Sequence, residues 1–187
     1  MLMEPDQRIL LSHARRCIEG LHRGLEAGNV EPPNQNLAGR SGAFVTLWKN
    51  GELRGCIGYV RPIGSVYECV LQSAAKAALD DPRFPPVMPE EVSSIEIEIS
   101  VLSPLQRITN TDDIEIGIHG LVVEHGDRQG LLLPQVAVAQ HWDRMKFLQQ
   151  TMAKAGLSRK QQNSEKTSIF TFTADVFSDH DTSFPSL

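Results

Sequence analysis

An Asn-Gly pair between two strand-like runs constrains the fold of this chain more than any other feature. Asn50-Gly51 follows the run Phe44–Trp48 and precedes a second run, Leu53–Val60. Both central positions of a tight hairpin turn need a positive φ, which Asn and Gly tolerate best. The sequence therefore predicts an antiparallel hairpin over about residues 44–60.

Further helices and strands are predicted on both sides of this hairpin. An amphipathic pattern predicts a helix over residues 6–27 that stops at Gly28. Ser65 and Glu68 match a capping box, which predicts a helix to about Leu79. Strict alternation predicts a half-buried antiparallel strand over residues 95–101. The remaining predicted elements are strands at Gly120–Glu124 and Leu131–Leu133 around a turn at Gly126–Gly130, a helical stretch from Pro134, a helix at Asp143–Ala155 and a strand at Ile169–Phe177.

The order of these elements favours an α+β fold with a mainly antiparallel sheet and packed helices. Hairpin, helix and strand follow one another twice, which suggests two similar halves, although the sequence shows no repeat. No segment has the composition of a long linker, and 187 residues suit one domain. We therefore expect a single domain over residues 1–187, in which two lobes share one core.

Composition limits the cellular compartment in which the protein is expected and the kinds of partner that it can bind. A net charge of −5 argues against a broad basic face for nucleic acid, so nucleic-acid binding is not expected. No apolar run reaches the length of a membrane span, and the N-terminal residues lack the pattern of a secretion signal. The chain has three cysteines, an odd number without close pairing, which fits a reducing compartment. We expect a cytoplasmic protein without membrane partners.

The sequence Leu-Arg-Gly-Cys-Ile-Gly at residues 53–58 is unusual for a strand. Gly55 and Gly58 weaken a strand, since glycine loses backbone entropy and offers no side chain to pack. They are useful where a ligand or another backbone must come close. Alternation would place Leu53 and Ile57 on one face of the strand and the even-numbered residues on the other.

The even-numbered face would then carry Arg54 and Cys56, with a glycine beside them. An arginine two residues from a thiol favours the thiolate by charge attraction, which indicates a nucleophile or an anion-binding point. The alternative is that Cys56 is a small buried apolar residue, as Cys17 and Cys69 are expected to be on their helices, and that Arg54 pairs with a surface carboxylate.

The same six residues, together with the segment before them, resemble the AMMECR family. The run Gly42–Leu47 and the segment Gly51–Gly58 carry the strongest likeness, and the likeness covers roughly residues 8–178. Other family-like segments follow in order: Asp81–Phe84, Ile97–Leu102, His119–Leu121, Leu133–Ala137 and Lys154–Leu157.

This resemblance implies a mixed α and β fold with two unequal lobes and a functional centre at residues 53–58, but no established reaction. Bacterial and archaeal members include protein A of the AmmeMemoRadiSam system. Bacterial genes of this family often lie beside, or are fused with, those of a Memo-type protein and a radical S-adenosylmethionine enzyme, which implies these two as pathway partners.

Several residues outside this segment are further candidates for the site. Asp81 and Arg83 could bind a charged ligand near Arg54, or could end a helix and pair with each other. His119 is a candidate base near the thiol, although a core or surface histidine is the alternative. Gln135 could present its amide to a ligand or merely cap a helix.

No metal or cofactor is expected. The metal-ligand spacings of Cys and His are absent, and His119 and His125, on the same face of one predicted strand, are too few ligands. A phosphate loop, a dinucleotide fingerprint and a hydrolase Gly-x-Ser-x-Gly motif are also absent. Glu96 and Glu98 are interpreted as the solvated face of a strand.

Two functions follow from these residues. The first is a thiol-dependent enzyme in which Cys56 is the thiolate, Arg54 stabilises it or binds an anion, and His119 moves protons. The second is a ligand- or peptide-binding adaptor module in which the cysteine is packed. In both, residues 53–58 line the centre, with Leu53, Gly55, Ile57 and Gly58 as binding residues and an unknown small molecule or protein as partner.

Overall fold

The structure, a computed structural model, describes residues 2–21, 31–162 and 164–179. The chain divides into two compact units, the first formed by residues 1–102 and 175–187 and the second by residues 103–174. Each unit has its own cluster of buried apolar side chains. The expectation of a single domain over residues 1–187 stays a prediction.

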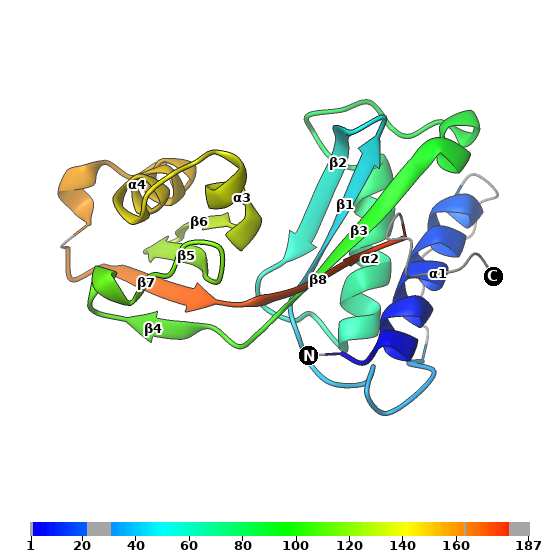
Figure 1. Ribbon diagram of the computed structural model, residues 1–187, viewed down its shortest axis with the longest axis horizontal. Helices are drawn as coiled ribbons and strands as arrows, with labels where there is room; N and C mark the ends of the chain where they lie inside the picture. Colours follow the sequence, from blue (N-terminus) through cyan, green and yellow to red (C-terminus); the bar gives the residue numbers. More distant parts are fainter. Residues whose placement is uncertain (1, 22–30, 163, 180–187) are drawn as a thin grey trace. The chain divides into compact units, whose positions relative to one another are not determined.

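The first unit is a four-stranded sheet with two helices on one face (Figure 1). The strand order is β2-β1-β3-β8. The elements are α1 (Glu4–Leu21), β1 (Ala43–Lys49), β2 (Glu52–Tyr59), α2 (Val66–Leu79), a short 3₁₀ helix η1 (Pro89–Ser94), β3 (Ile95–Leu102) and β8 (Ala174–Ser178).

Alternation along the central strands decides which face the helices cover. Val45 and Leu47 of β1 and Ile97 and Ile99 of β3 are almost fully buried in the core. Their chain neighbours point to the opposite face, as pleating requires. Burying each such side chain contributes about 1.5–3 kcal/mol, which holds α1 and α2 on this face.

The predicted hairpin and helix start are confirmed. β1 and β2 are antiparallel neighbours, and Asn50 and Gly51 have φ values of 54° and 78°. The N-terminus of α2 has the predicted capping box, with Ser65 and Glu68 bonding to each other's backbone N–H.

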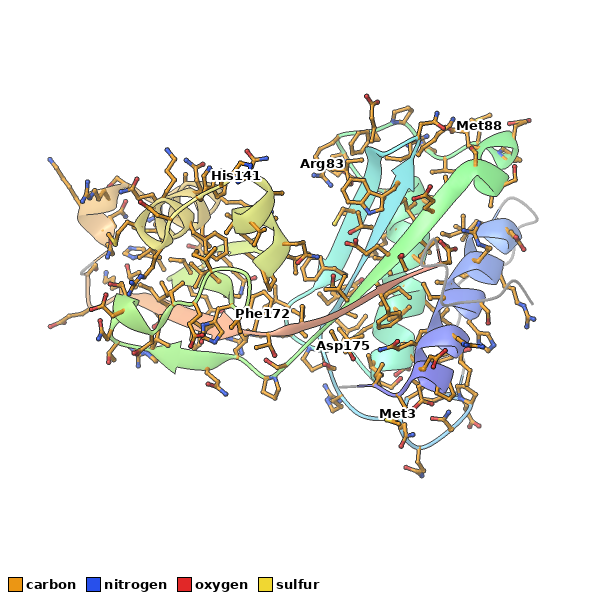
Figure 2. The ribbon with its side chains drawn as sticks, in the orientation of Figure 1. Met3, Arg83, Met88, His141, Phe172 and Asp175 are labelled. Carbon is orange, nitrogen blue, oxygen red and sulfur yellow. The ribbon has the colours of Figure 1, made fainter. Side chains whose placement is uncertain are left out.

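The second unit has a sheet in the order β4-β7-β5-β6 and two helices. Gly120 lies against the ring of Phe172, labelled in Figure 2, where a Cβ atom would be 2.2 Å from the ring. The elements are β4 (Gln106–Ile108), a 3₁₀ helix η2 (Thr111–Asp113), β5 (Gly120–His125), β6 (Arg128–Leu132), α3 (Pro134–Ala139), α4 (Arg144–Lys154), a 3₁₀ helix η3 (Arg159–Gln161) and β7 (Thr167–Phe172).

The two units share one strand arrangement, as the repeated order of elements suggested. In each, the first hairpin strand pairs with both the second hairpin strand and the strand after the helix. A fourth strand completes each sheet, β8 in the first unit and β4 in the second. The fourth strand follows the other strands in the first unit and precedes them in the second.

Several predicted boundaries were wrong. The predicted strand at residues 169–177 is two strands in different sheets, β7 and β8, separated at Thr173. The turn predicted at residues 126–130 is shorter, because β6 already begins at Arg128. Strand β4 was not predicted, since three residues are too few to show a period. The predicted helix end at Gly28 lies outside the described residues.

Among the helices in the described ranges, none combines the length and apolar character that crossing a membrane would need.

Replacing Gly55 with alanine tests the packing of α2 on β2. A Cβ atom at Gly55 would lie 2.3 Å from the carbonyl oxygen of Ala77, so helix and strand would have to separate. We expect Gly55→Ala to lower the free energy of unfolding by about 1–3 kcal/mol in urea denaturation. Gly39→Ala is the control, because its nearest contact would be an ordinary 3.6 Å. Equal stability of the two variants would contradict this account.

Candidate functional site

Cys56 lies on β2, an edge strand, on the face opposite the helices. Its partner on β1 is Thr46, whereas the neighbouring pairs Leu47–Gly55 and Val45–Ile57 belong to the core side. The Thr46 hydroxyl donates a hydrogen bond to the Cys56 sulfur, with an Oγ1–Sγ distance of 3.3 Å. Thr46 is buried and Cys56 is half-buried.

A bulge at Arg54 overturns the predicted alternation within the six-residue segment. Leu47 pairs with Gly55 but Trp48 pairs with Leu53, so Arg54 is an extra residue in β2. Leu53 therefore shares the face of Cys56, because its partner Trp48 alternates with the buried Leu47. The prediction that Leu53 and Ile57 lie on one face was wrong.

The backbone of Cys56 is held by the segment that follows α2. The Cys56 N–H donates to Oδ2 of Asp81 at 2.8 Å, and Nη2 of Arg83 donates to the Cys56 carbonyl at 3.1 Å. On an edge strand these two groups face away from the sheet and would otherwise be left to solvent. Asp81 and Arg83 thus replace a neighbouring strand at this residue.

Asp81 and Arg83 also bind each other. Nε and Nη2 of Arg83 donate to the two oxygens of Asp81 at 2.9 and 2.6 Å. The Asp81 side chain is 2% exposed and that of Arg83 is 53% exposed. This fork-shaped ion pair holds the pKa of the Asp81 carboxyl well below its usual range, with a further contribution from the Cys56 N–H.

Of Arg54 and Arg83, it is Arg83 whose guanidinium is bound to Cys56, through the carbonyl of that residue. Its pKa is raised first by the hydrogen bond and charge of Asp81, and also by charge and hydrogen bonding with Cys56. Figure 2 labels Arg83 in the segment beside β2. The ring of Phe84 packs against the same guanidinium, 5.4 Å from its centroid.

Arg54 is engaged elsewhere. Its Nε and Nη2 donate to the two oxygens of Glu91 at 3.2 and 2.9 Å, and its Nη1 and Nη2 donate to the carbonyls of Pro85 and Pro86. Lys49 binds the same carboxylate at 2.7 Å. Arg54, then Lys49, hold the pKa of Glu91 well below its usual range. Arg54 therefore fixes the segment after α2 to β2, and its expected action on the thiol stays a prediction.

The two glycines of the segment receive other parts of the protein. Gly55 lies against the carbonyl of Ala77 in α2. Gly58 lies against the ring of Phe44, where a Cβ atom would be 2.3 Å from the ring. The sequence suggested that these glycines allow a ligand or another backbone to come close. The structure shows the close approach of another backbone at Gly55 and of an aromatic ring at Gly58.

His119 and Gln135 belong to the second unit. His119 precedes β5, and its Nδ1 accepts a hydrogen bond from the Glu115 N–H at 3.1 Å. The prediction that His119 and His125 share one strand was therefore wrong. Gln135 lies in the first turn of α3, after Pro134. Their proposed roles stay predictions.

Sequence reasoning missed two residues, Thr46 and Glu91. Thr46 could have been sought opposite the thiol, but a regular two-residue hairpin would pair it with Gly55. Only the bulge brings it to Cys56. Glu91 had no signal, because it binds Arg54 from 37 residues away.

The Cys56 sulfur accepts a hydroxyl hydrogen bond, and the carbonyl of the same residue accepts one from a guanidinium. Groups of both kinds stabilise a thiolate more than a thiol when they contact the sulfur. The other cysteines are different, since Cys69 is fully buried and burial raises the pKa of Cys17. Within the described ranges, His, Cys, Asp and Glu side chains form no group of three or more that could hold a metal ion.

Replacing Asp81 with asparagine tests the ion pair through pH. Because the folded-state pKa of Asp81 is lowered, its stabilisation is full above the unfolded pKa of about 3.9 and is lost as pH falls below it. We expect Asp81→Asn to cost about 1–3 kcal/mol at pH 7, measured by urea unfolding, and less at pH 3. Asp112→Asn, which breaks an exposed pair with Arg144, should cost little at either pH. A cost for Asp81→Asn that does not change with pH would contradict this role.

The comparisons with known proteins agree on one family. Residues 11–177 match the AMMECR1 family. A protein of Methanopyrus kandleri is 43% identical over 173 residues, covering 86% of this chain and 84% of its own. A protein of Methanothermobacter thermautotrophicus is 40% identical and covers 94% and 95%.

A solved structure extends this agreement to the fold. The crystal structure of an uncharacterised protein of Pyrococcus horikoshii has a TM-score of 0.88 and 38% identity, and covers 98% of this chain and 96% of its own. The α+β fold and the family that the sequence indicated are thereby confirmed, and the chain belongs to the AMMECR1 family.

Proposed function

We propose that this protein carries out a thiol-dependent reaction in which Cys56 is the nucleophile. The observation that carries the proposal is that the Thr46 hydroxyl donates to the Cys56 sulfur while the Arg83 guanidinium is bound at the carbonyl of the same residue. A hydrogen bond to a charged group contributes about 1.5–3 kcal/mol, so the hydroxyl donor enriches the thiolate at neutral pH. Asp81 is the positioning residue, because it holds both Arg83 and the backbone of Cys56.

In this proposal Arg54 affects the thiol only indirectly. It fixes residues 85–91 to β2 and so maintains the segment that carries Arg83. A small molecule or a protein side chain would be the substrate.

The setting of the reaction rests on the family resemblance. The protein would work in the cytoplasm, where thiols stay reduced, in one pathway with a Memo-type protein and a radical S-adenosylmethionine enzyme.

An adaptor module is the second candidate, and one observation favours it. Ile116, Ile118 and Val138 are between 37% and 52% exposed in the second unit. Gly117 brings the loop of the first two against Val138, since a Cβ atom there would be 3.3 Å from a Val138 methyl group. Exposed apolar side chains of this kind suit a peptide or protein partner.

Alkylation of the folded protein separates the two candidates. We expect iodoacetamide to modify Cys56 at pH 7 well before Cys17 and Cys69, as measured by peptide mass spectrometry. Thr46→Val should slow the modification of Cys56 about tenfold, because it removes one hydrogen bond to the charged sulfur while keeping the shape. A Cys56 that resists alkylation until the protein unfolds would favour the adaptor.

A further inference from the structure

The Arg83 guanidinium is held by oxygen acceptors along one edge only. Nε and Nη2 of Arg83 donate to Asp81 and to the Cys56 carbonyl. Nη1 donates to no oxygen of the residues that the structure describes, and the side chain is 53% exposed. Arg54, by contrast, is only 13% exposed and uses all three of its nitrogens.

This difference indicates separate roles for the two arginines. Arg54 is enclosed by its acceptors, as suits a guanidinium that joins two segments of the fold. Arg83 keeps a donor edge at the surface and is bound to Cys56, a residue that is itself half-buried. We propose that Arg83 binds a carboxylate group of the substrate and so directs carboxylate-bearing electrophiles to Cys56. This inference rests on the proposed thiol function and adds the class of substrate.

Charge arguments favour a carboxylate over a more highly charged group. Asp81 already neutralises much of the charge of Arg83, so the free edge suits a group with a single negative charge. Glu98 would oppose an anion from the same face of the sheet, because it is the β3 neighbour of Thr46. It lies two strand spacings from Cys56, or about 10 Å, where salt screens most of its effect.

The chemical step needs no further reagent. The electron pair of the thiolate forms a carbon–sulfur bond, and the leaving group departs with the electron pair of the bond that breaks. The carboxylate on Arg83 would place the reacting carbon next to the sulfur before this step. Iodoacetate and iodoacetamide test this preference for a carboxylate. They share the reacting carbon and the iodide leaving group, and one carries a carboxylate where the other carries a neutral amide of similar size.

The test compares the rates of these two reagents at Cys56, with the same cysteine in the urea-unfolded chain as reference. The ratio of the iodoacetate rate to the iodoacetamide rate does not depend on how much thiolate is present. We expect the folded protein to raise this ratio about fivefold, the effect of one exposed ion pair. Arg83→Gln should return it to the unfolded value, and Arg83→Lys should keep part of the increase.

Two further variants make the result specific. Arg144→Gln removes the same charge from an exposed Arg–Asp pair in the second unit and should leave the ratio raised. Asp81→Asn combined with Arg83→Gln avoids a buried unpaired carboxylate, and should lose the preference like Arg83→Gln if that single variant fails to fold.

The outcomes separate the two proposals. If Cys56 reacts with neither reagent before unfolding, the thiol function is wrong and this inference falls with it. If Cys56 reacts but the ratio equals that of the unfolded chain, the thiol function stands and carboxylate recognition is wrong. A raised ratio that persists in Arg83→Gln also overturns the inference, since another group would then select the anion.

Discussion

The buried carboxylate of Asp81 is the interaction on which the arrangement around Cys56 depends. It accepts hydrogen bonds from the N–H of Cys56, from the backbone N–H of Arg83 and from two guanidinium nitrogens of Arg83. It lies two residues beyond the end of α2. The position of the C-terminal end of α2 therefore determines the position of the Arg83 guanidinium. A buried carboxylate is costly unless it is fully paired, so Asp81, Arg83 and the β2 edge can occupy their places only together.

Local signals in the sequence were sufficient for most of the fold. The turn at Asn50-Gly51, the capping box of α2 and the alternation in β3 each depend on residues within a few positions of one another. The strands β7 and β8 could not be separated in this way, because their residues form one continuous strand-like run. Their assignment to different sheets is a property of long-range pairing, which a single sequence does not display.

The site was only partly predictable for the same reason. Cys56, Asp81 and Arg83 were all recognised as candidates, and the structure brings these three together. The choice between the two arginines was not predictable. Adjacency in sequence favoured Arg54, but the bulge makes it the extra residue of β2, and its guanidinium is bound by Glu91. Arg83 reaches Cys56 only because α2 returns the chain to the edge of β2.

A comparison of β2 with β6, its counterpart in the second unit, shows which features of residues 53–58 the shared strand arrangement requires. Gly130 of β6 packs against the carbonyl of Thr151 in α4, as Gly55 of β2 packs against α2. A glycine therefore stands in both units where a helix packs on the second strand of the hairpin. The next pair differs, because the place of Cys56 and its partner is taken by two buried apolar residues, Leu131 and Val122. One strand arrangement thus accepts an aliphatic pair at this point, so packing alone does not account for a thiol and a hydroxyl in the first unit.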